Sequence, residues 1–224
     1  MSQETVDLDL EKSSDRPVQS LTWFQTWKLA LTRPSVATFE RIIRDPQANP
    51  RLAYVWLFVS FIVGGLISIL ISDLIGAINT GVNSITCGPL ISAIVSLLSL
   101  VLVTWVIQSI AGRLFGGIGT YASMIYAIAA FSAPLFIIHS LVLGIPFVNC
   151  LDVPLSIYEL ALSVIALKAV NKIGWGQAMV SYIGGLVLVI GIVAVFTVCS
   201  LIILGPAVSE ELQNIITGAG GIVP

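Results

Sequence analysis

The stretch LAYVWLFVSFIVGGLISILISDLIGAI (residues 52–78) decides the fold class, because Asp73 is its only charged residue. A helix needs about 20 apolar residues to cross the hydrocarbon core of a bilayer. Four further apolar stretches follow along the chain, at residues 89–111, 124–144, 154–170 and 179–205. We therefore expect an all-α polytopic membrane protein, with a bundle of five transmembrane helices over residues 52–205. A re-entrant segment is the alternative for the short fourth stretch.

The composition agrees with a membrane location. Of the 224 residues, 57% are hydrophobic and only 10% are charged. A soluble domain carries about a quarter charged residues, so this chain has too little polar surface to keep a globule of its size in water. Soluble enzyme folds are therefore excluded. The formal net charge of −2 gives no reason to expect nucleic acid as a partner.

The placement of the basic residues predicts the orientation of the spans. All ten Lys and Arg residues lie in residues 1–51, 112–123 and 168–178. Because cytoplasmic segments of membrane proteins carry an excess of Lys and Arg, these three segments are expected on the cytoplasmic side. The N-terminus is then cytoplasmic, and residues 206–224 form an extracytoplasmic tail.

The chain before the first span divides into two parts. Residues 1–20 are acidic and lack a basic start followed by an apolar core, which favours a flexible solvated tail over a signal peptide. Residues 21–51 hold five basic and two acidic residues among apolar residues at helical spacing. This pattern predicts amphipathic cytoplasmic helices in the lipid headgroup layer, anchored by Trp23, Phe24 and Trp27. In the alternative, the same apolar face packs on the protein's own membrane helices.

Ionisable residues within membrane spans are the usual candidates for function. The spans hold three of them toward the outer leaflet, Asp73, His139 and Glu159. If the three converge, they could form a proton relay, a cation site or a metal site. In the alternative reading, Asp73 reaches the outer interface, and His139 and Glu159 form a buried hydrogen-bonded pair that is only structural.

Catalytic motifs are missing from the sequence. The chain has one histidine, no GxSxG-like turn near it, no HExxH and no Cys/His cluster with zinc spacing. The loop LFGGIGT (residues 114–120) superficially suggests a nucleotide fingerprint, but it follows a membrane helix rather than a strand and is interpreted as a tight turn. We therefore expect neither enzymatic activity nor a cofactor or metal.

Small residues recur at every fourth position of the first span: Ser60, Gly64, Ser68 and Ser72. The second and fifth spans repeat this spacing with Ser92 and Ser96, and with Ser181 and Gly185. Small residues let membrane helices approach closely, so these stripes predict helix packing. The alternative is that the serines line a polar pathway.

Pro134 lies in the middle of the third span. A proline inside a helix removes one backbone hydrogen bond, so we expect a kink there. The kink is either a hinge or a static feature of the helix.

The three cysteines suggest one disulfide. The expected topology places Cys87 and Cys150 in the two outer loops, whereas Cys199 lies within the fifth span. Because disulfides persist in oxidising compartments, we expect a bridge between Cys87 and Cys150. The alternative is two thiols whose Cα atoms are too far apart to bridge.

Three segments carry a family resemblance: LTRPSVATFERIIRDPQANPRLAYVWLFVSFIVGG (residues 31–65), RLFGGIGTYASMIYAIAAFSAPLFII (113–138) and NKIGWGQAMVSYIGG (171–185). Together they resemble the Yip1-domain family of five-span membrane proteins, particularly its prokaryotic members, over residues 31–205. The resemblance implies a location in the inner membrane of a prokaryotic cell. The DLYGP-like element and the YGxxxxG pattern of the eukaryotic branch are not intact here, so that branch's work with small GTPases is not carried over.

Two functional hypotheses follow. The first is a non-enzymatic integral membrane protein that binds partner proteins, membrane lipid or a second copy of itself, as an organising subunit of a larger assembly. The second is a small transporter or channel that uses the intramembrane polar residues. A conducting path through five helices with so few polar residues would require an oligomer.

Overall fold

The computed structural model describes residues 20–75, 88–145, 148–195 and 198, and these residues are helical with short connections. Two short helices precede four long ones and a single 3-10 turn: α2 (Trp23–Thr32), α3 (Val36–Ile43), α4 (Pro50–Ile75), α5 (Gly88–Phe115), α6 (Tyr121–Gly144), η2 (Asn149–Leu151) and α7 (Asp152–Asn171). A further long helix, which we call the last helix, covers Trp175–Val195.

Five of these helices are long and apolar enough to cross a membrane: Pro50–Ile71, Gly88–Phe115, Tyr121–Leu143, Asp152–Asn171 and Trp175–Val195. The predicted all-α class with five candidate spans is therefore confirmed. The fourth helix begins at Asp152, two residues before the predicted start, because Pro154 is tolerated in a helical first turn. At 20 residues it has the length of a full span, so a re-entrant segment is not needed to explain it.

Helix α6 forms the centre of the bundle. It packs against α4, α5 and α7, and 67% of its span is buried inside the protein, against 17% for the last helix. Its inner part is rich in alanine, with Ala127, Ala129, Ala130 and Ala133 all fully buried. Small side chains let neighbouring helices approach on several sides, which explains why this helix and not another lies in the middle.

The small residues of α4 lie at its contact with α6. Ser60 is buried, and a Cβ atom added to Gly64 would come within 2.5 Å of Ser140 Oγ and 2.7 Å of Phe136 Cε1. Ser68 instead lines a groove of about 420 Å³ that also contains Ser92 and Ser96 of α5. The side chain of Ser72 lies outside the described residues. The stripe of small residues in the first span therefore divides between a packed part and a groove.

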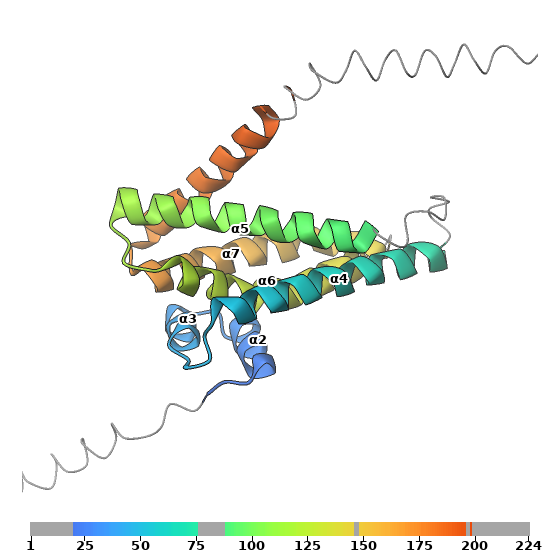
Figure 1. Ribbon diagram of the computed structural model, residues 1–224, viewed down its shortest axis with the longest axis horizontal. Helices are drawn as coiled ribbons and strands as arrows, with labels where there is room; N and C mark the ends of the chain where they lie inside the picture. Colours follow the sequence, from blue (N-terminus) through green and yellow to red (C-terminus); the bar gives the residue numbers. More distant parts are fainter. Residues whose placement is uncertain (1–19, 76–87, 146–147, 196–197, 199–224) are drawn as a thin grey trace, which may run out of the picture.

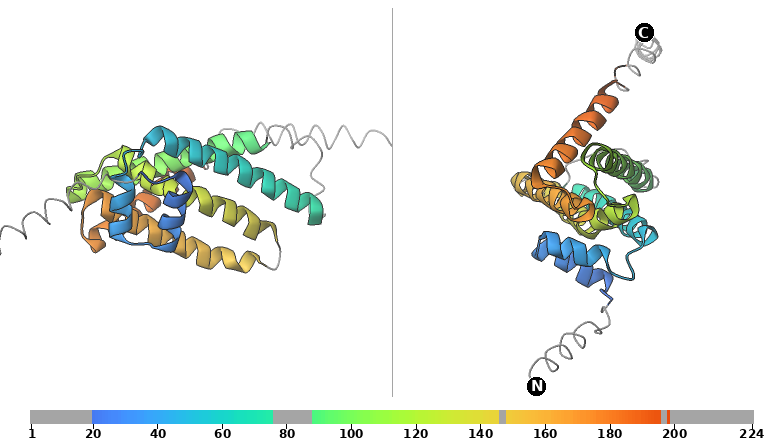
Figure 2. Two further views of the ribbon diagram at one scale, coloured as in Figure 1. Left: turned by 90° about the horizontal axis from the view of Figure 1, so that it is seen from below. Right: turned by 90° about the vertical axis from the view of Figure 1, so that its left-hand side faces the viewer.

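Helices α2 and α3 run across the long helices rather than along them, on one side of the bundle (Figures 1 and 2). Thr22 and Gln25 form a capping box at the start of α2, and Ser35 caps α3. Phe39 and Ile42 of α3 are fully buried, and the Phe39 ring lies edge-on to Phe131 of α6 at 5.9 Å between centroids. The apolar face of α3 is thus used for packing on the protein itself.

The last helix packs on the bundle only near its start and then diverges from it (Figure 1). Ala178 and Ser181 are fully buried, and a Cβ atom added to Gly185 would come within 3.3 Å of Ile107 Cα on α5. From Val187 onward the described apolar side chains are mostly exposed. Ser181 and Gly185 therefore mark the stretch over which this helix meets its neighbours.

Pro134 lies inside α6, which is continuous from Tyr121 to Gly144.

Cys150 is exposed in η2, whereas Cys87 and Cys199 lie outside the described residues, as do the tails at residues 1–19 and 199–224. The Cys87–Cys150 bridge stays a prediction.

Candidate functional site

A chain of polar side chains connects α6 and α7 near the end of the bundle where the two helices join. We call Ser132, His139, Asp152 and Glu159 the histidine cluster. His139 Nδ1 and Asp152 Oδ1 are hydrogen-bonded at 2.6 Å, and His139 Nε2 lies 3.5 Å from Glu159 Oε2. Ser132 Oγ donates to Glu159 Oε1 at 3.2 Å. One imidazole therefore lies between two carboxyl groups.

The antiparallel pairing of α6 and α7 produces this arrangement. Asp152 and Glu159 are seven residues apart, which places them on the same face of α7. His139 lies five residues before the end of α6 and so meets that face between them. If Nδ1 donates its proton to Asp152, Nε2 is left facing Glu159. Nε2 is buried and has no hydrogen-bond partner among the described residues.

Glu159 also lines a cavity of about 410 Å³ between α5, α6, α7 and the last helix. Six hydroxyl groups share its wall, from Ser96, Ser99, Thr104, Ser132, Ser163 and Tyr182. Hydroxyl groups can bind water or a small polar solute inside a membrane protein. No cluster of three or more His, Cys, Asp or Glu residues suited to a metal ion occurs in the part of the chain that the structure describes.

Sequence reasoning found part of this cluster. The structure brings His139 and Glu159 together, whereas the side chain of Asp73, the third candidate, lies outside the described residues. Asp152 was assigned to an outer loop and missed, although it is the first residue of α7 and contacts His139 directly. Its seven-residue spacing from Glu159 was the available signal.

A second polar cluster lies at the opposite end of the bundle, close to the helix ends that carry Arg51, Arg113, Lys168 and Lys172; we call this the basic end. The side chains of Gln108 on α5 and Asn171 on α7 are both buried. Gln108 Nε2 donates to Asn171 Oδ1 at 2.8 Å, and Asn171 Nδ2 donates back to Gln108 Oε1 at 2.9 Å. Further bonds run from Gln108 Nε2 to Gly119 O and from Asn171 Nδ2 to Leu167 O. We call this pair the amide clamp.

The glycine-rich loop between α5 and α6 closes over the amide clamp. A Cβ atom added to Gly117 would lie 2.6 Å from Asn171 Oδ1, and one added to Gly119 would lie 2.6 Å from Val170 O. Ile118 N donates to Asn171 O at 3.3 Å. The loop thus needs glycine because its backbone lies directly on α7. Sequence reasoning identified the turn but missed the clamp, whose signal was one polar amide in each of two apolar helices.

The entry segment is tied to the bundle by a buried carboxylate that the sequence analysis did not single out. Asp45 accepts from Leu21 N at 2.6 Å and from Gln47 N at 2.8 Å. Tyr158 of α7 donates its hydroxyl proton to Leu31 O at 2.5 Å. These bonds fix the start and end of α2 relative to α3 and α7.

The three expected interfacial anchors occupy different environments. Trp23 and Phe24 are 56% and 61% exposed. The Trp27 ring instead contacts Trp56 of α4 at 5.9 Å between centroids, and Trp56 in turn contacts Tyr126 of α6. Trp23 and Phe24 are therefore available to lipid, whereas Trp27 fastens α2 to the bundle.

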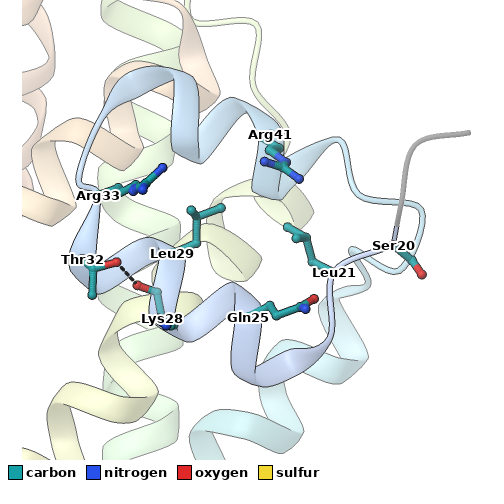
Figure 3. Close-up of a pocket in the computed structure, with 8 residues that line it drawn as sticks. All are labelled: Ser20, Leu21, Gln25, Lys28, Leu29, Thr32, Arg33 and Arg41. Carbon is teal, nitrogen blue, oxygen red and sulfur yellow. Dashed lines mark hydrogen bonds between the residues drawn. The ribbon is translucent and has the colours of Figure 1, made fainter. Parts of the chain in front are cut away.

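On the side of α2 away from the bundle, a pocket of about 350 Å³ opens between α2 and α3 (Figure 3). It is lined by Ser20, Leu21, Gln25, Lys28, Leu29, Thr32, Arg33 and Arg41. Arg33 from the connecting turn and Arg41 from α3 extend into this space from two sides (Figure 3). We call it the basic pocket.

Comparison with known proteins identifies one family. The model of the Yip1 domain matches residues 28–198, which is more than half of the chain. The matched range includes α3 and all five candidate spans. No curated protein and no solved structure matches the chain.

Proposed function

Because the chain belongs to the Yip1 domain family, we propose that it is a non-enzymatic integral membrane protein that binds membrane lipid or partner proteins through α2 and α3. In this proposal it is an organising subunit of a larger membrane assembly. It lies in the inner membrane of a prokaryotic cell, with its basic end toward the cytoplasm, since Arg51, Arg113, Lys168 and Lys172 gather at that end.

The observation that carries the proposal is the surface of α2 and α3. Trp23 and Phe24 are exposed side by side, with 5.9 Å between their ring centroids. The segment formed by α2, α3 and the turn between them also carries three cationic residues, Lys28, Arg33 and Arg41. No carboxylate lies within 4.0 Å of their charged groups among the described residues. Exposed aromatic rings next to unpaired cationic groups are typical of a surface that binds anionic lipid or an acidic partner.

The environment of His139 also supports a role without catalysis. Both ring nitrogens face carboxyl groups, at 2.6 Å from Asp152 and 3.5 Å from Glu159. A nucleophilic serine needs an imidazole nitrogen as its base within hydrogen-bond reach. Ser132 donates instead to Glu159, so the cluster is not arranged as a serine–histidine pair.

To test the proposal, the protein is solubilised gently from its native membrane, and co-purifying lipids and proteins are identified by mass spectrometry. The W23S/F24S variant should lose a specific partner or lipid that the wild type retains. The matched control is W105S, because Trp105 is 55% exposed on α5. Helix α5 lies across the bundle from α2 and α3 (Figure 1). Equal recovery of the same partners by W23S/F24S and wild type would overturn the proposal.

The histidine cluster supports transport as a second candidate function. Asp152, His139 and Glu159 form a continuous line of proton-binding groups, and Glu159 ends it at a cavity lined by hydroxyls. Proton or cation flux into liposomes should then be abolished by E159Q and unaffected by E40Q on α3. Wild-type protein that passes neither protons nor small cations would exclude this candidate.

A further inference from the structure

The basic pocket collects positive charge without neutralising it. Lys28, Arg33 and Arg41 all line the pocket, and among the described residues none of them forms an ion pair. Two of the five other described basic residues have a partner: Arg44 Nη2 lies 3.6 Å from Glu40 Oε2, and Lys168 Nζ lies over the Trp175 ring at 4.9 Å. Three like charges gathered at one cavity repel one another, so the pocket is suited to an anion.

The hydrogen-bonding groups of the pocket match a phosphate group. The planar guanidinium groups of Arg33 and Arg41 can each donate two parallel bonds to phosphate oxygens, and Lys28 adds a point charge. Gln25 uses its carbonyl Oε1 to accept from Thr22 N at 3.0 Å, which leaves its NH₂ group as a further donor. Leu21 and Leu29 complete the lining with apolar surface beside the charges (Figure 3).

One contact of α2 with the first span places the Trp27 part of the helix near the membrane surface. Trp27 contacts Trp56, which lies six residues after Pro50, the start of the first span. At a rise of 1.5 Å per residue this is about 9 Å into the span. Amphipathic helices in the membrane plane insert about 5–10 Å, so the contact between Trp27 and Trp56 lies at the depth of the boundary between headgroups and acyl chains.

We propose that the basic pocket is a phosphate-binding site filled by the headgroup of an anionic phospholipid. Its position favours this source, while soluble phosphate has the same recognition chemistry. The inference rests on the proposed function and names the ligand class for the α2–α3 surface. The apolar lining from Leu21 and Leu29 contacts the glycerol and the start of the acyl chains, while Arg33 and Arg41 hold the phosphate.

The test uses purified full-length protein in detergent and native mass spectrometry. It is titrated with dihexanoyl phosphatidylglycerol, with zwitterionic dihexanoyl phosphatidylcholine and with inorganic phosphate. Phosphatidylglycerol should bind the wild type, and R33Q/R41Q should bind it at least tenfold more weakly. The control R113Q/K172Q removes the same charge from the basic end outside the pocket and should change binding less than twofold. R33K/R41K, which keeps the charge but not the planar fork, should give an intermediate loss.

Phosphatidylglycerol binding that inorganic phosphate displaces only weakly identifies the lipid as the source, and equal displacement identifies soluble phosphate; both support the site. Unchanged binding by R33Q/R41Q, or equal loss in R113Q/K172Q, overturns it. If phosphatidylglycerol binds only after the acidic residues 1–19 have been deleted, the phosphate site is overturned for the full chain. If partners still co-purify in a manner that depends on Trp23 and Phe24 while the phosphate site fails, the proposed function stands without it.

Discussion

At the basic end of the bundle, Gln108 and Asn171 hydrogen-bond to each other and to backbone carbonyls, and a glycine loop closes over them. At the opposite end, His139 lies between Asp152 and Glu159 with a buried Nε2 atom that lacks a hydrogen-bond partner among the described residues. The first cluster consists of neutral amides that are satisfied, whereas the second consists of titratable groups beside a cavity. Satisfied buried amides stabilise one packing arrangement, whereas a partly satisfied polar cluster contributes less to it.

The comparison indicates a division of roles between the two ends. The amide clamp and the glycine loop hold α5, α6 and α7 in fixed positions at the basic end. Helices α2 and α3 pack on α6 and α7, so they rest on a rigid support. The histidine cluster contributes less to stability, since Asp152 and Glu159 are 31% and 35% exposed.

The largest effect is expected from N171L. The leucine leaves both the donor and the acceptor of the buried Gln108 amide without Asn171, and each unsatisfied buried group costs about 1–3 kcal/mol. We expect the free energy of unfolding in mild detergent to fall by about 3 kcal/mol, measured by denaturant titration. The control Q47L changes an exposed amide and should have little effect. Because Q108L/N171L removes both partners, its free energy of unfolding should be partly restored relative to N171L. If the double variant loses more stability than the sum of the losses in Q108L and N171L, the clamp is contradicted.

W27S should have the next largest effect, since Trp27 joins α2 to Trp56. Complete truncation of a buried tryptophan costs about 3–5 kcal/mol; Trp27 is only partly buried, so about 2 kcal/mol is expected. Limited proteolysis should then cut residues 21–44 faster in W27S than in W23S/F24S. Equal cleavage of the two variants would show that the three aromatic residues act alike.

G119A tests the contact between the loop and α7. The new methyl group would meet Val170 Cγ1 at 2.5 Å and Val170 O at 2.6 Å, and overpacking of this kind costs about 1–3 kcal/mol. The melting temperature should fall relative to G184A, because nothing lies within 4 Å of a Cβ atom at Gly184. Identical melting temperatures would mean that the loop does not rest on α7.

D152N should have the smallest effect on stability. Partly exposed ion pairs contribute about 0.2–1 kcal/mol, so we expect a loss below about 1 kcal/mol in the same denaturant titration. A loss as large as that of N171L would remove the distinction between the two ends.

The five spans were predictable because they depend only on composition and length, which the sequence contains directly. The pairing of His139 with Glu159 was also within reach, since few ionisable residues lie in the spans. The amide clamp was not, because Gln108 and Asn171 lie 63 residues apart and meet only through the register of α5 against α7. The same limit explains why Trp23 and Trp27 were grouped together: helical spacing places both on an apolar face, but only tertiary packing separates the exposed ring from the one against Trp56.

Photocrosslinking in native membranes can show whether α2 and α3 form the proposed binding surface of this membrane protein. A photoreactive amino acid replaces Phe24 on α2 in one variant and Val95 on α5 in another; the two residues are 61% and 56% exposed. We expect a discrete adduct with a partner protein or an anionic lipid from position 24 that is absent from position 95. A discrete adduct from position 95 alone, or the same adducts from both positions, would contradict it.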